Sequence, residues 1–250
     1  MNTNAQELKG KIALITGGNS GIGYATAKEL KAQGAEVIIT GRRKEAVDKA
    51  AADLGVTGLV ADQGHIKAIE QLASQISEKY GKLDILFINA GVLEITPIGD
   101  ATEKAFDNVI NVNFKGAYFT LGKFIPLLNE KASVVFLSSN TASMNGAGSS
   151  IYSSSKAALN AVMKIAAVEL APRKIRVNSV SPGPTETEIL NKVGYSDEQL
   201  IQVKEWMIDK IPLKKIGSAR DVGKMVAYFC GPAAEFITGA EIVMDGGMRL

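Results

Sequence analysis

The sequence has one cysteine and one histidine among its 250 residues. One cysteine cannot form a disulfide within the chain, which fits a reducing compartment. One histidine cannot build a His-rich site, so no metal is expected. The chain also lacks an early apolar run of signal-peptide length and any apolar stretch long enough to cross a bilayer. We therefore expect a soluble, cytoplasmic protein that does not associate with a membrane.

An excess of charge of one sign is also missing. Lysine and arginine number 28 against 26 acidic residues, which gives a formal net charge of +2. This balance, without a long basic run, argues against a nucleic-acid partner. With 46% hydrophobic and 22% charged residues the chain can bury a large core, which excludes a disordered or fibrous protein. No internal repeat or composition break divides it, so residues 1–250 are predicted to form a single domain.

Short apolar runs alternate with longer amphipathic stretches along the chain. The runs are rich in β-branched residues and are therefore predicted to be strands. They are 12–15, 37–39, 58–60, 85–88, 134–137, 175–177 and 242–244. Helix-like segments include 22–33, 66–79, 101–128, 151–170 and 219–230. Because parallel strands need a crossover helix, this alternation predicts an α/β fold: a doubly wound, Rossmann-like parallel sheet of about seven strands with helices on both faces. Ligands of such sheets bind at the carboxyl ends of the strands.

A glycine-rich loop with the spacing G-x-x-x-G-x-G follows the first run. Gly17 can form the sharp turn, Gly21 lets the backbone approach a diphosphate, and Gly23 lets the following helix pack close to the strand. The helix N-terminus then offers N–H groups to a phosphate. The alternative is a glycine-rich turn without a ligand, but the strand–loop–helix context favours a dinucleotide. The predicted contacts are Gly17, Asn19, Ser20, Gly21, Ile22 and Gly23.

The second run ends in Thr40-Gly41-Arg42-Arg43-Lys44. Folds that bind NAD usually carry an acidic residue here, which accepts a hydrogen bond from the ribose 2′-hydroxyl. A guanidinium instead pairs with a 2′-phosphate, which a carboxylate would repel. We expect Arg42 to contact that phosphate and leave Arg43 open between phosphate contact and solvent, while Lys44 begins the next helix. The cofactor predicted from this pattern is NADP(H).

The strongest catalytic pattern is Tyr152-Ser153-Ser154-Ser155-Lys156. Residues four apart on a helix share one face, and a cation beside a phenol lowers the pKa of that phenol toward neutral pH. Such a tyrosine can serve as a general acid or base. Ser139 ends the fifth run, where its hydroxyl would point into the same cleft. A Tyr-x-x-x-Lys pair alone is commonly structural, but the glycine loop and Ser139 in the same chain favour catalysis.

Together these motifs resemble the short-chain dehydrogenase/reductase family over nearly the whole chain. The resemblance adds Asn113 to Ser139, Tyr152 and Lys156 as a catalytic tetrad. It places Asp62 at the adenine amino group and adds its neighbour Gln63 to the cofactor contacts. Asp62 could instead, or as well, cap the helix that begins near His65. His65 itself is expected at the surface. The further cofactor contacts that the resemblance implies are Asn89, Ala90, Gly91, Tyr152, Lys156, Pro182, Gly183, Thr185 and Thr187, with Thr187 at the carboxamide.

The activity implied by the resemblance is hydride transfer between the nicotinamide and the carbonyl carbon of a small-molecule substrate. Ser139 would bind the carbonyl oxygen, and Tyr152 would give or remove its proton. Lys156 would lower the pKa of Tyr152 and hold the ribose, and Asn113 would hold a water of a proton relay. The family also implies a homotetramer. This makes the chain a ketoreductase or alcohol dehydrogenase that uses NADP(H).

Substrate contacts are expected from three segments bordering the cleft: 92–96, 140–151 and a lid at about 188–211. The lid contains apolar residues, and we see no arginine clamp, which favours an uncharged ketone or secondary alcohol. Trp206 and Met207 could instead anchor the lid or a subunit contact. Two other functions stay open: an NAD-dependent sugar, polyol or steroid-type alcohol dehydrogenase on the same scaffold, and a nucleotide-sensing relative without catalysis.

Overall fold

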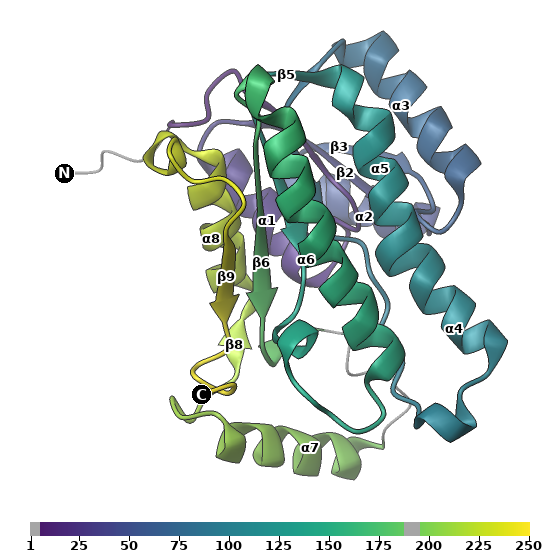
Figure 1. Ribbon diagram of the computed structural model, residues 1–250. Coiled ribbons are helices and arrows are strands. Elements are labelled where there is room, and N and C mark those ends of the chain that lie inside the picture. The colour runs from purple at the N-terminus through teal and green to yellow at the C-terminus, as the bar shows by residue number, and fades with distance from the viewer. Residues whose placement is uncertain (1–5, 188–195) are drawn as a thin grey trace.

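A single seven-stranded sheet forms the centre of the computed structural model, which describes residues 6–187 and 196–250 (Figure 1). The strand order is β3-β2-β1-β4-β5-β6-β9, and every neighbouring pair is parallel. The strands are β1 (Ile12–Ile15), β2 (Glu36–Gly41), β3 (Thr57–Val60), β4 (Leu83–Ile88), β5 (Leu128–Leu137), β6 (Arg176–Pro182) and β9 (Glu241–Met244). A separate parallel pair joins β7 (Thr185–Glu186) to β8 (Gly217–Ser218).

Helices connect the strands as the alternating pattern predicts. They are α1 (Gly21–Ala32), α2 (Lys44–Leu54), α3 (Ile66–Tyr80), α4 (Glu103–Val109), α5 (Ala117–Phe124), α6 (Ser150–Leu170), α7 (Asp197–Lys210) and α8 (Ala219–Cys230). Short 3-10 helices span Ile98–Asp100, Ile125–Leu127, Asn140–Ser143, Ala171–Arg173 and Pro232–Ala234. The predicted fold class is therefore confirmed. The helix α2 was not among the helix-like segments, although Lys44 does begin it as expected.

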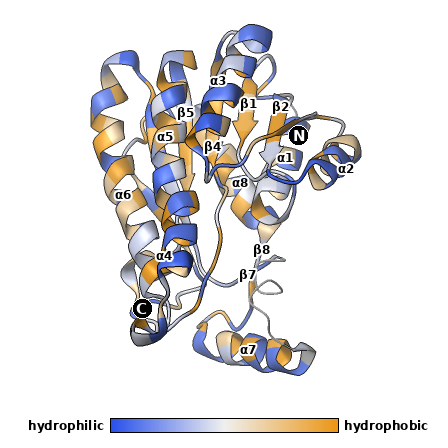
Figure 2. Ribbon diagram, turned by 90° about the vertical axis from the view of Figure 1, so that its right-hand side faces the viewer, coloured by the Kyte–Doolittle hydropathy of each residue, from blue (hydrophilic) through white to orange (hydrophobic). Residues whose placement is uncertain are grey.

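The sheet is buried on both faces because successive strand residues point to opposite sides. Leu14 and Leu86 face one core, which α3, α5 and α6 cover, whereas Ile15 and Phe87 face a second core under α1, α2 and α8. Figure 2 shows hydrophobic strands inside and hydrophilic colour on the outer helix surfaces. Near-continuous apolar strands are the expected signature of such a two-sided core. The edge strand β3 departs from it, because Val60 there is exposed.

The strand order reverses direction between β1 and β4. From β1 the chain builds outward through β2 and β3, and from β4 it builds the other way to β9. In doubly wound sheets this switch point opens a crevice at the carboxyl ends of the strands. The segments following β1, β2, β3, β4, β5 and β6 hold the predicted site residues, so they meet along one edge of the sheet.

The predicted helix 101–128 is helical from residue 103 to 127 but is not a single α-helix. It contains α4, a π-helical segment Ile110–Gly116, α5 and the 3-10 turn Ile125–Leu127, and Leu128 already belongs to β5. A Cβ on Gly116 would lie 2.0 Å from the carbonyl oxygen of Gln63, so the wide π turn presses bare backbone against the chain after β3. That approach is a long-range contact which helical periodicity does not encode.

The helix α7 stands apart from those that cover the sheet, beyond the carboxyl ends of the strands (Figures 1 and 2). Ser196 caps it, accepting from the N–H of Gln199 while the Gln199 side chain accepts from the N–H of Ser196. The predicted lid at 188–211 is partly outside the described residues, because 188–195 are not described. In the part that is described, Trp206 is 56% exposed. No helix of the described chain is long and apolar enough to cross a membrane.

Candidate active site

The glycine loop turns sharply between β1 and α1. Gly17 and Gly21 have φ angles of 64° and 55°, the left-handed region that favours glycine. A Cβ on Gly23 would lie 2.4 Å from the Gly17 carbonyl oxygen, so only glycine lets the first turn of α1 close on the loop. The Ser20 side chain makes no capping hydrogen bond to α1 within the described chain. The first N–H groups of α1 are therefore suited to bind an anion such as a diphosphate.

A hydrogen-bonded brace joins this loop to the end of β4. The Thr16 hydroxyl accepts from the N–H groups of Asn89 and Ala90, each at 3.0 Å. The Asn89 carboxamide donates to the carbonyls of Thr16 at 2.8 Å and Gly17 at 3.1 Å. Asn89 therefore braces the glycine loop against β4, and Thr16, the residue before the loop, supports it.

The end of β2 shows why position 41 holds glycine. A Cβ there would lie 2.4 Å from Oδ1 of Asn19, so the glycine loop packs directly on the Gly41 backbone. An acidic side chain at this position would need Asn19 to move. Arg42 and Arg43 follow with exposed side chains, Arg43 at the N-cap of α2. Arg42 is therefore the first long side chain after Gly41.

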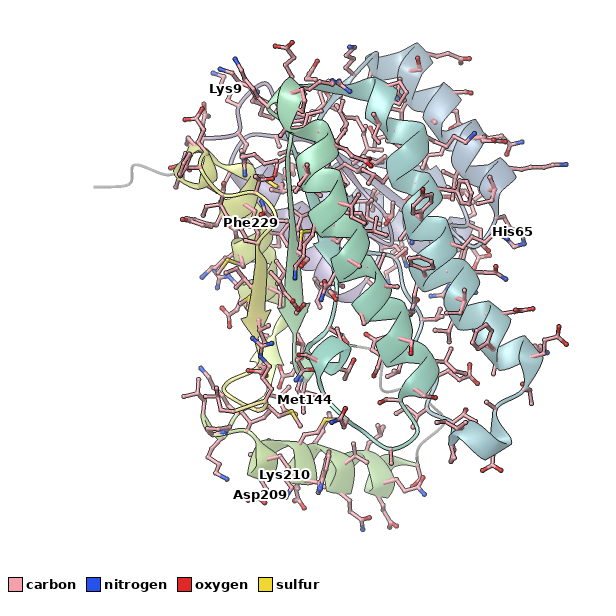
Figure 3. The ribbon with its side chains drawn as sticks, viewed as in Figure 1. Lys9, His65, Met144, Asp209, Lys210 and Phe229 are labelled. Carbon is pink, nitrogen blue, oxygen red and sulfur yellow. The ribbon has the colours of Figure 1, made fainter. Side chains whose placement is uncertain are left out.

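After β3, the side chains of Asp62 and Gln63 make different hydrogen bonds. Oδ1 of Asp62 accepts from the N–H of Gly64 at 2.9 Å, and α3 begins only at Ile66, so the alternative of Asp62 as its N-cap is wrong. The Gln63 carboxamide donates to the carbonyls of Ala90 and Val112 at 3.1 and 3.0 Å. It ties the β4 loop to the π-helical segment. The exposed His65 lies at the margin of the molecule, as Figure 3 shows.

Ser139 and Tyr152 meet at the carboxyl end of β5. Ser139 lies two residues after the end of β5, is 7% exposed, and caps the 3-10 turn Asn140–Ser143. Tyr152, in the first turn of α6, shares a side-chain hydrogen bond with Ser139. The two hydroxyls therefore lie close enough to hold one substrate oxygen between them.

Burial and hydrogen bonding act in opposite directions on the pKa of Tyr152. Burial is the larger influence and raises the pKa of Tyr152 above its usual value of 10.0, while the Ser139 hydrogen bond lowers it. Lys156 is not among the causes of this shift, so the expected lowering of the pKa of Tyr152 by Lys156 stays a prediction. The Lys156 ammonium lies 5.7 Å from the Tyr152 ring centre and donates to the carbonyl of Leu137 at 2.8 Å.

Lys156 is itself perturbed. Its side chain is 3% exposed, and burial lowers the pKa of Lys156 from 10.5 to about 8. Burial disfavours the charged amine because the ammonium loses hydration. The lysine can therefore release or take a proton close to neutral pH, which an exposed lysine cannot do.

Asn113 lies in the π-helical segment and is 1% exposed. Its Oδ1 accepts from the N–H of Val92 at 2.8 Å, and its Nδ2 donates to the Val92 carbonyl at 2.9 Å and to Ser155 Oγ at 3.3 Å. The Ser155 hydroxyl in turn donates to the Tyr152 carbonyl at 2.6 Å. Asn113 thus connects the chain after β4 with α6. The family resemblance predicted Asn113 but not its partners Val92 and Ser155.

The segment after β6 crosses toward the glycine loop. Pro182 ends β6, and Gly183 packs against Asp245, where a Cβ would lie 2.6 Å from the Asp245 Cβ. The Thr185 hydroxyl donates to the Gly183 carbonyl at 2.9 Å. A Cβ on Gly21 would lie 3.4 Å from the Thr187 side chain, so Thr187 packs beside the glycine loop. The structure therefore brings this segment to the other predicted cofactor contacts.

Residues near the chain end line the turn after Ser139. The Asn140 carboxamide lies 3.8 Å from the Met248 sulfur, and Arg249 donates to the Ser143 hydroxyl at 3.2 Å. Met144 lies at the end of the molecule that holds α7, as Figure 3 shows. Arg249 is a cation that sequence reasoning did not place here, because more than one hundred residues separate it from Ser143.

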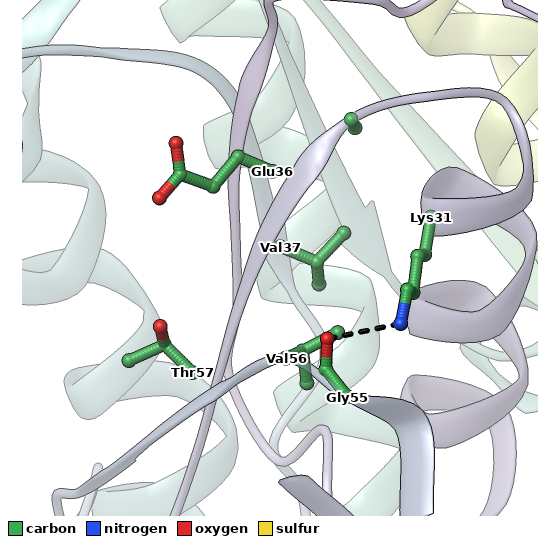
Figure 4. A pocket seen from close by; sticks show the side chains of 7 residues that line it. Lys31, Glu36, Val37, Gly55, Val56 and Thr57 are labelled. Atoms are coloured by element: carbon green, nitrogen blue, oxygen red, sulfur yellow. Dashed lines mark hydrogen bonds between the residues drawn. The ribbon is translucent and has the colours of Figure 1, made fainter.

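A small cavity lies at the opposite, amino edge of the sheet (Figure 4). Its volume is about 240 Å³, and residues at the starts of β2 and β3 line it, among them Glu36 and Thr57. Lys31 reaches over it to donate to the carbonyls of Leu54 and Gly55, where α2 ends. Because its cation already stabilises a helix terminus, this cavity is not the candidate active site.

Comparison with known proteins agrees with this geometry. A family model described as enoyl-(acyl carrier protein) reductase matches residues 17–249. A versicolorin reductase of Emericella nidulans is 34% identical over 96% of both chains. A short-chain dehydrogenase of Burkholderia cenocepacia, solved in complex with NADP, is 32% identical with a TM-score of 0.89, over 98% of this chain and 100% of its own. A Brucella melitensis structure titled glucose/ribitol dehydrogenase is 29% identical with a TM-score of 0.91, over 98% and 99%.

The fold and the site define a dinucleotide-binding oxidoreductase, the class to which these relatives belong. The chain is a member of the short-chain dehydrogenase/reductase family. Members of this family use nicotinamide cofactors.

Proposed function

We propose that this chain is an NADP(H)-dependent oxidoreductase that interconverts a ketone and a secondary alcohol. The observation that carries the proposal is the convergence of Ser139, Tyr152 and the buried Lys156 beside the glycine loop. A fold that only sensed nucleotides would not need a hydroxyl pair hydrogen-bonded at the cleft beside a lysine with a pKa of about 8. The non-catalytic alternative is therefore disfavoured.

The bound cofactor supplies the hydride chemistry, and the protein supplies orientation and protons. Ser139 donates a hydrogen bond to the substrate oxygen. Tyr152 gives that oxygen a proton in reduction and removes it in oxidation. Lys156, whose ammonium lies 5.7 Å from the Tyr152 ring centre, would hold the ribose hydroxyls of the cofactor. Asn113 fixes the chain after β4 against α6. No step requires a metal.

The preference for NADP(H) rests on the end of β2. Asn19 lies so close to Gly41 that an acidic residue, the usual acceptor for an NAD ribose, would need Asn19 to move. Arg42 is exposed directly beyond it. A relative solved with NADP supports the same choice. The alternative is an NAD-dependent sugar, polyol or steroid-type dehydrogenase. The similarity to a structure named glucose/ribitol dehydrogenase supports testing this alternative as well.

The test is a screen of ketones and secondary alcohols with NADPH, NADP⁺, NADH and NAD⁺, followed by nicotinamide absorbance. We expect turnover with the phosphorylated cofactors and uncharged carbonyl compounds. The panel includes ketones bearing a carboxylate, because Arg249 is hydrogen-bonded to Ser143 on the turn after Ser139. Turnover with NAD⁺ and polyols alone would support the alternative, and binding of cofactor without turnover of any compound would contradict an enzymatic role.

Assembly as a homotetramer in the cytoplasm belongs to the same proposal. Exposed apolar side chains on α4, α5 and α6 support contact between copies, because soluble monomers rarely expose many in one region. They are Phe106, Tyr118, Phe119, Ile165 and Val168. We expect light scattering to give the mass of four chains. The mass of one chain would contradict this.

A further inference from the structure

The Ser139 hydroxyl receives two hydrogen bonds from one neighbour. The N–H of Thr141 donates to Ser139 Oγ at 3.2 Å, and the Thr141 hydroxyl donates to the same oxygen at 3.0 Å. A serine hydroxyl has two acceptor lone pairs and one proton. With both lone pairs used, Ser139 retains only its proton for any further partner.

The remaining proton makes Ser139 a hydrogen-bond donor, which is the role that the reaction needs. Ser139 also shares a hydrogen bond with Tyr152, and that bond lowers the pKa of Tyr152, as donation to the phenol oxygen does. The chain of donors therefore runs from Thr141 through Ser139 toward the oxygen atoms at the reacting centre. Hydrogen bonds in such a chain polarise one another, so each strengthens the next.

We propose that Thr141 is a positioning residue, whose hydroxyl holds Ser139 as a hydrogen-bond donor toward the substrate carbonyl oxygen. This rests on the proposed function. Without the Thr141 hydroxyl, one lone pair of Ser139 is free to accept, and its proton is no longer directed to a single partner. The Thr141 N–H alone suffices to cap the 3-10 turn, so the hydroxyl is not needed to form the turn.

The neighbouring Ser143 offers a matched comparison on the same turn. Its hydroxyl donates to the Asn140 carbonyl at 3.3 Å and has no hydrogen bond to Ser139 among the described residues. Removing it changes one hydroxyl of the turn but leaves the donors to Ser139 in place. An effect that came only from loosening the turn would be the same for both positions.

The experiment compares Thr141→Val, Thr141→Ser and Ser143→Ala under saturating NADPH. Loss of one hydrogen bond predicts a kcat about three- to tenfold lower for Thr141→Val, with the KM for NADPH unchanged. Thr141→Ser retains the hydroxyl and restores kcat, and Ser143→Ala lowers kcat less than Thr141→Val does, because both donors to Ser139 remain. Equal kcat in Thr141→Val and wild type, or equal losses in Thr141→Val and Ser143→Ala, would overturn the proposal.

A double-mutant cycle with Ser139→Ala tests whether Thr141 acts through Ser139. We expect Thr141→Val to have no further effect on kcat once Ser139 is alanine, since its only route to the substrate has gone. A full additional loss in that background would mean direct substrate contact and would refute the positioning role. Wild-type turnover in Ser139→Ala itself would contradict the proposed function instead, so the two failures are distinguishable.

Discussion

At the carboxyl edge of the sheet Lys156 donates to the carbonyl of Leu137, and at the amino edge Lys31 donates to the carbonyls of Leu54 and Gly55. The bonds are alike, but the surroundings differ. Lys31 is exposed and stabilises the end of α2, whereas Lys156 is buried beside Tyr152, and burial lowers the pKa of Lys156 to about 8. A lysine on a backbone carbonyl is therefore structural or functional according to its burial and its neighbours.

The two edges also each hold a tyrosine that is hydrogen-bonded to a hydroxyl side chain. Tyr80, at the end of α3, donates to the Thr57 hydroxyl at 3.1 Å, and Tyr152 is bonded to Ser139. Thr57 lines the small cavity, and Ser139 lies just after β5, in the candidate active site. The chemistry of a tyrosine–hydroxyl pair is thus the same at both edges, and only the carboxyl edge adds a buried lysine and a glycine loop.

The largest predicted effect separates these two tyrosines. Tyr152→Phe should lower kcat by roughly 10²–10⁴-fold, because the ring still packs but the acid–base hydroxyl is lost. Cofactor affinity should persist, since the glycine loop, Arg42 and Lys156 remain. Steady-state rates and a cofactor titration measure both quantities. Tyr80→Phe is the matched control and should keep wild-type turnover.

An active Tyr152→Phe enzyme would break the comparison, since it would make both tyrosines structural. A loss of turnover in Tyr80→Phe as large as that in Tyr152→Phe would also contradict the comparison, because it would show that the two tyrosines do not differ in their effect on catalysis.

The next effect concerns stability and compares the lysines. The pKa of Lys156 falls from 10.5 to about 8, a difference of 10.5 − 8 = 2.5, which corresponds to roughly 3 kcal/mol. Between these pH values the unfolded chain binds more protons than the folded one. The cost of the buried charge is therefore complete below pH 8 and disappears as the pH rises to 10.5.

Lys156→Met should accordingly raise the free energy of unfolding of the cofactor-free protein by about 1–3 kcal/mol at pH 7, after the lost bond to Leu137 is subtracted. This gain should vanish above pH 10.5, and cofactor affinity should fall. Urea denaturation at several pH values measures it. Lys31→Met should instead lower the free energy of unfolding by about 0.5–1.5 kcal/mol at pH 7. A destabilised Lys156→Met protein at pH 7 would contradict the role of burial.

The smallest effect tests the end of β2. Arg42→Ala should weaken NADPH binding about tenfold or more and leave NADH binding unchanged, because a charged hydrogen bond contributes roughly 1.5–3 kcal/mol. Fluorescence titration with both cofactors measures the two affinities. The same titration on Arg43→Ala decides between the two roles left open for Arg43. Weaker NADPH binding would indicate contact with the 2′-phosphate, and unchanged binding would indicate a side chain in solvent. Equal NADPH affinity in wild type and Arg42→Ala would remove the basis for NADP(H) preference.

Much of the candidate site follows from local sequence. Gly17, Gly21 and Gly23 are needed where a strand turns directly into a helix, and Tyr152 and Lys156 share a face because they are four residues apart. The seven strands were predicted because residues buried on both faces must be apolar. These features depend on neighbours a few positions away, so the sequence by itself determined the fold class and the edge of the sheet where the site lies.

Only the tertiary structure decided how those residues are held. The π-helical segment around Asn113 exists beside the Gln63 carbonyl and the Val92 backbone, which are distant in sequence. The pKa of Tyr152 rises because burial outweighs its Ser139 hydrogen bond, a balance that a motif does not contain. Contacts of this kind depend on how separate segments pack, since desolvation and hydrogen-bond geometry arise only when the chain is folded.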